Sequence, residues 1–179
     1  MKICILDGNE HGKIVKKIIT ELAPPTVEVE LITVLDKGGH CTNDMLCQGL
    51  VYCLFNDVDI VNISLGLDYM SAEVEDIINK LCDKGVKVVC ASGNGKCCYP
   101  ALHPRTISVG AIDENGELRP YTVEGSYDVL EKDGYEVDGN KWYGTSFSCA
   151  VYVGKLVGRD VAQWLRSESE VMCDGKEER

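Results

Sequence analysis

The sequence has little positive charge and no long hydrophobic run. Lys and Arg number 18 against 29 Asp and Glu, so the chain of 179 residues carries a formal net charge of -11. Nucleic-acid binding needs a basic face, and this balance excludes one. No apolar stretch is long enough to span a bilayer. The N-terminus is unlike a signal peptide, because its apolar run is short and ends at Asp7. We therefore expect a cytoplasmic protein that binds neither nucleic acid nor membrane.

The ten cysteines are not spaced like a disulfide framework or a zinc site. No C-x-x-C pair occurs, and the adjacent Cys97 and Cys98 have a poor geometry for a closed metal site. Without a secretion signal we expect free thiols in a reducing compartment, most of them acting as small buried apolar residues. The prediction is a protein with no bound metal and no cofactor.

Apolar periodicity predicts strands that alternate with helices. The predicted strands cover residues 2–6, 27–35, 59–65, 86–91 and 106–112. The predicted helices cover residues 11–22, about 42–55 and 72–82. This order predicts an α/β fold with a doubly wound, mostly parallel sheet and helices on both faces.

The last third of the sequence is less regular. Residues 114–140 are polar and rich in glycine, and we predict a loop there with a short strand near 127–130. An apolar run then predicts a helix from Ser146 to Leu165. We expect one domain over residues 1–166, followed by a charged, frayed tail over 167–179.

Several polar residues stand where predicted strands end. Asp7, Gly66 and Asn94 each follow a strand, and His11 comes soon after the first one. The carboxyl ends of parallel strands share one edge of the sheet, where active groups gather. Ser146 lies where a loop enters a helix, close to free backbone N–H groups and the positive end of the helix dipole. Such a serine is either a nucleophile or only a helix cap.

Asp7, His11 and Ser146 together supply the groups of a catalytic triad. Serine needs a base to take its proton, histidine is the natural base near neutral pH, and a carboxylate orients that histidine. Four residue steps separate Asp7 from His11 and span at most about 13–14 Å, which permits direct contact. Two alternatives remain. Asp7 could cap the next helix while Glu10 orients His11, or His11 could be only a polar residue at a helix start.

The sequence resembles the subtilisin-like serine peptidases, the subtilases. Gly144-Thr145-Ser146 resembles their nucleophile motif, and residues 88–94 resemble the strand that ends at their oxyanion-hole asparagine. Further matching segments occur in the family's order at residues 11–12, 34–55, 58–66, 99–101 and 107–111. The resemblance runs in register from residue 2 to about residue 157. The stretch between the aspartate and the histidine is shorter than is usual in the family.

This resemblance implies a role for each matching residue. Ser146 would attack the scissile carbonyl, with His11 as general base and then general acid, and Asp7 would orient His11. The Asn94 side chain and the backbone N–H of Ser146 would hold the oxyanion, although Asn94 also fits a simple turn. The residues that would pair with an extended peptide or protein substrate are Ser64, Leu65, Gly66, Gly38 and Gly39. Cys97 and Cys98 would either line the specificity pocket or pack inertly.

The implied function is that of a serine endopeptidase that works through an acyl-enzyme. We expect a small single-domain member of the family without a propeptide or the family's calcium site, and with narrow intracellular peptide-processing specificity. Asp68, just past the binding strand, hints at basic residues in the peptide. The alternative is a catalytically weak or inactive module that binds an extended peptide. A nucleotide-binding domain is disfavoured, because no strand is followed by a phosphate-binding glycine motif.

Overall fold

A six-stranded parallel sheet forms the centre of the molecule. The computed structural model describes residues 1–174, with side chains for all of these except residues 9 and 160–174. The sheet order is β2-β1-β3-β4-β5-β6, and every neighbouring pair is parallel. The strands are β1 (Lys2–Asp7), β2 (Glu28–Thr33), β3 (Ile60–Ile63), β4 (Lys87–Ala91), β5 (Ile107–Ile112) and β6 (Val129–Lys132). The predicted doubly wound α/β fold is confirmed.

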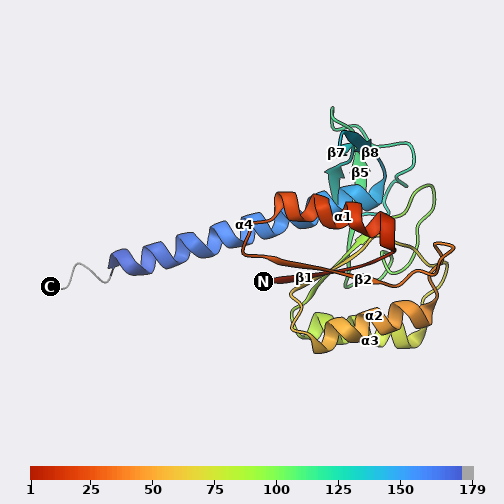
Figure 1. Cartoon of the computed structure of the whole chain (residues 1–179), viewed down its shortest axis with the longest axis horizontal. Coiled ribbons are helices and arrows are strands. Elements are labelled where there is room, and N and C mark those ends of the chain that lie inside the picture. Colours follow the sequence, from red (N-terminus) through yellow and green to blue (C-terminus); the bar gives the residue numbers. More distant parts are fainter. Residues whose placement is uncertain (175–179) are drawn as a thin grey trace.

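Two helices cover each face of this sheet (Figure 1). Helices α1 (Asn9–Leu22) and α4 (Thr145–Asp174) pack on one face, and α2 (Asn43–Phe55) and α3 (Ala72–Asp83) pack on the other. Successive side chains of a strand point to opposite faces. Accordingly Ile3 and Ile5 of β1 belong to the core under α1 and α4, whereas Cys4 and Leu6 belong to the core under α2 and α3. This burial on both sides explains why the strands are apolar along their whole length.

Side-chain caps define the starts of α2 and α3. The Thr42 hydroxyl accepts the N–H of Met45 at 3.2 Å, and the Ser71 hydroxyl accepts the N–H of Val74 at 3.4 Å. Thr42 is therefore the cap of α2, at the start of the helix predicted over about residues 42–55. Asn43 instead accepts the N–H of Ser71 at 2.8 Å, which joins the starts of the two helices.

The region between β5 and α4 corrects the predicted loop. It contains β6 two residues later than expected and an antiparallel hairpin, β7 (Tyr135–Val137) with β8 (Asn140–Trp142). The hairpin turn is Asp138-Gly139, whose φ angles are 52° and 76°. Two central residues with positive φ are what a tight hairpin turn of this length requires, and Asp-Gly supplies them. The hairpin leads directly into the loop before α4.

Helix α4 is longer than the apolar pattern predicts. It runs to Asp174, beyond Leu165, and its C-terminal half extends past the rest of the molecule (Figure 1). The helix therefore covers residues 167–174 of the expected tail, while residues 175–179 lie outside the described part of the chain. The domain boundary at residue 166 stays a prediction. Within residues 1–174, no helix is both long and apolar enough to cross a membrane.

The sheet order also fixes where a site can form. The chain leaves β1 toward β2 on one side and later returns to β3 on the other side of β1. In open α/β sheets ligands bind at such a switch point, beyond the carboxyl ends of the strands. Asp7, Ser64 and Asn94 all lie at this edge, at or after the ends of β1, β3 and β4.

Candidate active site

Asp7 and His11 form a direct pair at the end of β1. Asp7 is the last residue of the strand and only 1% exposed, and His11 lies in the first turn of α1. Nδ1 of His11 is 2.8 Å from Oδ2 and 2.9 Å from Oδ1 of Asp7. The Gly8 N–H also donates to Oδ1, at 2.6 Å, and fixes the carboxylate. An ionised carboxylate only accepts, so the neutral tautomer of His11 that fits this contact carries its proton on Nδ1 and leaves Nε2 as the acceptor that a general base needs.

The alternative carboxylate has another partner. Glu10 accepts from Lys13 Nζ at 2.7 Å and is exposed to solvent. Helix α1 begins two residues earlier than the sequence predicts, at Asn9, so His11 lies within the first turn of the helix. The short Asp7–His11 stretch therefore produces a contact between residues four apart.

A ring contact brings His11 against the helix that carries Ser146. The centroids of the His11 and Phe147 rings are 5.2 Å apart at an interplanar angle of 46°. Phe147 also packs on Trp142 of β8, with centroids 5.6 Å apart. The side chain of His11 remains 37% exposed, so its outer edge is open to solvent.

Ser146 occupies the first turn of α4, as the sequence predicts. Its hydroxyl donates to the carbonyl oxygen of Ser64 at 3.1 Å, and the Ser64 hydroxyl donates to the carbonyl oxygen of Ser146 at 3.3 Å. Among the described side chains, the Ser146 hydroxyl has no hydrogen bond to His11. The structure thus places the serine on the correct edge with its proton directed to the neighbouring strand. Catalytic hydrogen bonds of this kind are often long or misaligned without substrate.

A buried hydrogen-bond network lies next to this pair of serines. Asn62 Nδ2 donates to the Ser64 hydroxyl at 3.0 Å, and Asn62 Oδ1 accepts from the Cys149 thiol at 3.3 Å. Burial raises the pKa of the Cys149 thiol, which keeps it protonated and able to donate. Cys149 is fully buried, in agreement with the expectation that most of the cysteines are small buried residues.

Asn94 is tied to the start of α4 by its side chain. Its Oδ1 accepts both the N–H and the hydroxyl of Thr145, each at 3.1 Å. Because the oxygen is occupied in this way, the Nδ2 group of Asn94 is the part left to donate. The residue is exposed, and its neighbours Gly93 and Gly95 have φ angles of 104° and 80°, so the backbone of this segment bends sharply.

Ser146 and Asn94 line one cavity of about 220 Å³. Three of the predicted substrate-binding residues, Ser64, Leu65 and Gly66, line it too. Cys98 forms part of the wall, and a Cβ atom at position 66 would lie 2.4 Å from its sulfur, so only glycine fits there. Cys97 is not among the lining residues.

The other predicted substrate-binding glycines lie apart from this cavity. Gly39 lines a second hollow of about 450 Å³ beside His11, whereas Gly38 does not line it. The loop is closed by Asp36, whose Oδ1 accepts the N–H groups of Gly38 and His40 at 2.8 Å each. These two bonds lower the pKa of the Asp36 carboxyl.

The charge beside the cavity is balanced. Asp68 accepts from Lys96, a residue of the cavity wall, and this hydrogen bond lowers the pKa of the Asp68 carboxyl. Asp68 is thus paired within the protein, and the expectation of basic residues in a bound peptide stays a prediction. In the part of the chain that the structure describes, no cluster of three or more His, Cys, Asp or Glu could hold a metal ion.

Comparison with known sequences decides the family. The family model described as "Subtilase family" matches residues 5–157, which contain Asp7, His11, Asn94 and Ser146. The chain belongs to the subtilase family. It is 33% identical over 131 residues to Subtilisin Savinase of Lederbergia lenta, covering 67% of this chain and 49% of that protein. It is 30% identical over 154 residues to the minor extracellular protease Epr of Bacillus subtilis (strain 168), covering 78% of this chain and 24% of that protein. The chain thus spans about half or less of the length of these relatives.

Solved structures of proteases share the fold. The protease domain of PatA superposes with a TM-score of 0.75 at 20% identity, covering 86% of this chain and 76% of that one. The prenylagaramide maturation protease PagA superposes with a TM-score of 0.73 at 18% identity, covering 86% of this chain and 72% of that one. The subtilase fold is therefore present although the chain is short.

Three contributors to the subtilase site were not predicted from the sequence. Thr145 fixes the Asn94 oxygen, Phe147 contacts the His11 ring, and Asn62 holds Ser64. Thr145 and Phe147 flank Ser146, so the nucleophile motif itself was a signal for them. Asn62 was the one polar residue inside the apolar strand β3, which is a second signal, because a buried amide needs partners.

Proposed function

We propose that this subtilase is a serine endopeptidase with Ser146 as nucleophile, His11 as base and Asp7 as the residue that orients His11. The observation that carries the proposal is the Asp7–His11 hydrogen bond, held against the first turn of α4 by the contact with Phe147. A buried carboxylate that holds Nδ1 and leaves Nε2 free to accept a proton is the arrangement that general-base catalysis needs.

The proposed reaction starts with a rotation of the Ser146 hydroxyl from the Ser64 carbonyl toward Nε2 of His11. His11 takes the proton as the Ser146 oxygen attacks the peptide carbonyl, and Asp7 stabilises the resulting imidazolium. The oxyanion accepts hydrogen bonds from Nδ2 of Asn94 and from the Ser146 N–H. His11 then gives its proton to the leaving amine, which produces the acyl-enzyme. Water activated by His11 releases the acid and restores Ser146.

An extended peptide is the proposed substrate. Its backbone would pair with residues 64–66 in the cavity and with the Gly38-Gly39 loop on the side of His11. We propose narrow peptide-processing specificity inside the cell. Two structural neighbours are named a maturation protease and a lanthipeptide protease. They share only the fold with this chain, and they make a precursor peptide the first substrate class to test.

Cleavage of a peptide library, read by mass spectrometry, tests this proposal. Wild-type protein is expected to cut a small set of peptides, and the Ser146→Ala and His11→Ala variants are expected to cut none. Ser148→Ala is the matched control, because Ser148 lies on the same helix and its buried hydroxyl has no hydrogen-bond partner among the described residues. Equal cleavage by wild type and Ser146→Ala would show that another protein in the preparation is responsible.

A peptide-binding module is the second candidate function. The observation that favours it is the direction of the Ser146 hydroxyl, which points to Ser64 and not to His11. Under this hypothesis, folded wild-type protein would retain peptides from the library without cutting them. Substitution of Gly66 by alanine, which crowds Cys98 in the cavity wall, would abolish retention.

A further inference from the structure

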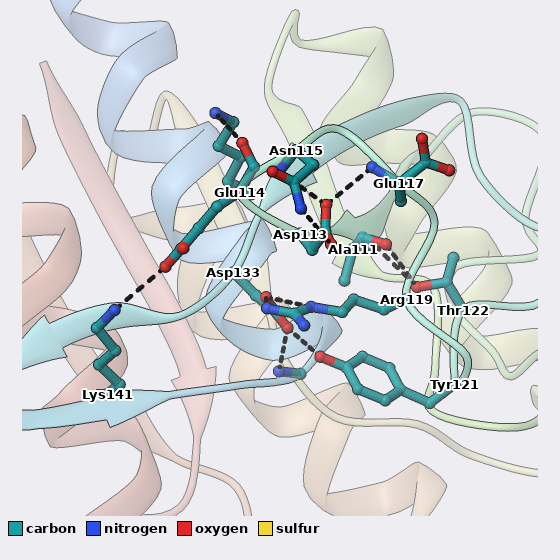
Figure 2. Close-up of polar contacts among 12 residues, drawn as sticks. Ala111, Asp113, Glu114, Asn115, Glu117, Arg119, Tyr121, Thr122, Asp133 and Lys141 are labelled. Atoms are coloured by element: carbon teal, nitrogen blue, oxygen red, sulfur yellow. Dashed lines mark hydrogen bonds and ion pairs between the residues drawn. The ribbon is translucent and has the colours of Figure 1, made fainter.

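A buried carboxylate next to the site has a role that the triad does not explain. Asp133 follows β6 directly, and its side chain is 0% exposed. Its Oδ1 accepts from Nε and Nη2 of Arg119, each at 2.8 Å. Its Oδ2 accepts from the Tyr121 hydroxyl and, at 3.0 Å, from the backbone N–H of Gly144 (Figure 2). All four donors therefore converge on one carboxylate.

Gly144 is where this carboxylate meets the catalytic serine. The residue lies two positions before Ser146 and has a φ of 133°, a conformation that favours glycine. Its carbonyl oxygen accepts the N–H groups of Phe147 at 3.0 Å and Ser148 at 3.2 Å. The orientation of Gly144 thus sets the first turn of α4, and Asp133 holds the N–H of that same residue.

Tyr121 connects Asp133 to the segment that carries Asn94, the other proposed oxyanion donor. Its carbonyl oxygen accepts the N–H of Gly95 at 2.6 Å, next to Asn94. Burial and the adjacent carboxylate raise the pKa of Tyr121, so its hydroxyl stays protonated and donates to Asp133. One cluster therefore holds both segments from which the proposed oxyanion donors come.

Arg119 supplies the countercharge that the buried carboxylate needs. Its Nε and Nη2 nitrogens both contact Oδ1, and its guanidinium carbon lies 5.1 Å from the centre of the Tyr143 ring. Figure 2 shows Arg119 and Tyr121 reaching the same carboxylate from the segment that follows β5. A buried ion pair contributes little net stability compared with apolar residues of the same volume. The Arg119–Asp133 pair therefore matters here because it fixes the position of the Asp133 carboxylate.

We propose that Asp133 is a positioning residue for the subtilase site. It acts through the Gly144 N–H on Ser146, and through Tyr121 on the Asn94 segment. The inference rests on the proposed function for its effect on catalysis, but the coupling between Asp133 and the two segments is a property of the fold and is measurable without catalysis.

The test compares Asp133→Asn with Asp113→Asn. The asparagine at position 133 keeps the size of the side chain, but its NH2 group cannot accept from Gly144 or Tyr121 while the oxygen binds Arg119. Asp113 is the matched control, because among the described residues its carboxylate accepts hydrogen bonds only within its own turn, from Asn115 and Glu117. Reaction with a fluorophosphonate at a temperature well below unfolding gives the maximal inactivation rate separately from the affinity for the probe.

We expect Asp133→Asn to lower the maximal inactivation rate by about 10- to 100-fold, because a small misplacement of reacting groups has effects of this size. The affinity for the probe should change by less than about threefold, since the wall residues Leu65, Gly66 and Cys98 lie outside the two segments that Asp133 holds. Tyr121→Phe, which removes one donor and keeps the ring, should lower the rate by about 3- to 10-fold. Asp113→Asn should leave it unchanged. A merely structural role would lower the unfolding temperature and leave the inactivation rate of the folded protein unchanged.

Amide hydrogen exchange separates this inference from the proposed function. Peptides that cover residues 93–97 and 142–148 should exchange faster in Asp133→Asn than in wild type or Asp113→Asn. If wild type never reacts with the fluorophosphonate but exchange increases in this way, the positioning role holds and the proposed function fails. If Asp133→Asn does not fold, Tyr121→Phe decides by the same two readouts. Unchanged exchange in both segments, or an unchanged inactivation rate in a reactive protein, overturns the inference.

Discussion

The residue on which the proposed chemistry depends most is Asp7. Its carboxylate is buried, accepts the Gly8 N–H, and contacts Nδ1 of His11 with both oxygens. An amide at this position would present a donor to His11 and favour the wrong tautomer. We therefore predict that Asp7→Asn lowers peptide turnover by about 1,000- to 10,000-fold while the chain still folds. Glu10→Gln is the control and should be as active as wild type, because Glu10 contacts Lys13 at the surface.

Asn94 is the second residue whose role is testable alone. Asn94→Asp keeps an oxygen for Thr145 but loses the Nδ2 donor and places a negative charge beside the oxyanion. Turnover should fall by at least about 100-fold, the lower end of the loss known for an oxyanion-hole donor in subtilisin itself. The affinity for substrate should change far less. Asn115→Asp, in a surface turn, is the comparison. Equal losses in turnover and affinity would point to a binding role for Asn94.

At the scale of elements, Glu30 links strands β1 and β2 to helix α2. Its carboxylate on β2 accepts from Lys2 of β1 at 2.9 Å and from the Tyr52 hydroxyl of α2 at 2.8 Å. The hydrogen bond from Lys2, and then that from Tyr52, lowers the pKa of Glu30 below its ordinary value of 4.5. A lowered folded-state pKa means that this stabilisation is complete above about pH 4.5 and is lost as the pH falls through the folded-state value.

The prediction concerns the pH dependence of folding. Glu30→Gln should lower the free energy of unfolding at pH 7, and the difference from wild type should shrink steadily between pH 4.5 and pH 2. Urea unfolding at a series of pH values measures this difference in the free energy of unfolding. The control is Glu117→Gln, at an exposed position. A difference that stays constant across this range would show that the pairs with Lys2 and Tyr52 contribute no pH-dependent stability.

The sequence predicts those elements that a local pattern of apolar and polar residues specifies. The apolar strands, the helices that start near residues 42 and 72, and the edge that gathers Asp7 and Asn94 are all predictable, because periodicity and element ends are local. The hairpin was missed because its strands are three residues each and Asp138-Gly139 was interpreted as part of a loop. Contacts between distant segments, such as Asn94 with Thr145, leave no periodic signal, so only the structure shows them.

At the scale of the molecule, the site is assembled from nearly the whole chain. Asp7 and Ser146 come from opposite ends of the sequence, and the sheet order brings them to one edge. The cavity beside Ser146 is small, about 220 Å³, and is narrowed by Cys98 against Gly66. We therefore predict narrow cleavage: unfolded casein should yield few fragments under conditions in which a processed peptide is fully cut. Rapid digestion of casein at many unrelated positions would contradict this specificity.

The central claim is that Ser146 is a nucleophile activated by His11, and covalent labelling tests it most directly. Folded wild-type protein is exposed briefly to a fluorophosphonate, its intact mass is measured, and the modified residue is mapped. The account predicts a single adduct on Ser146, absent from Ser146→Ala and His11→Ala, much slower in Asp7→Ala, and retained in Ser148→Ala. A folded wild-type protein without an adduct, or an adduct that survives in His11→Ala, would contradict it.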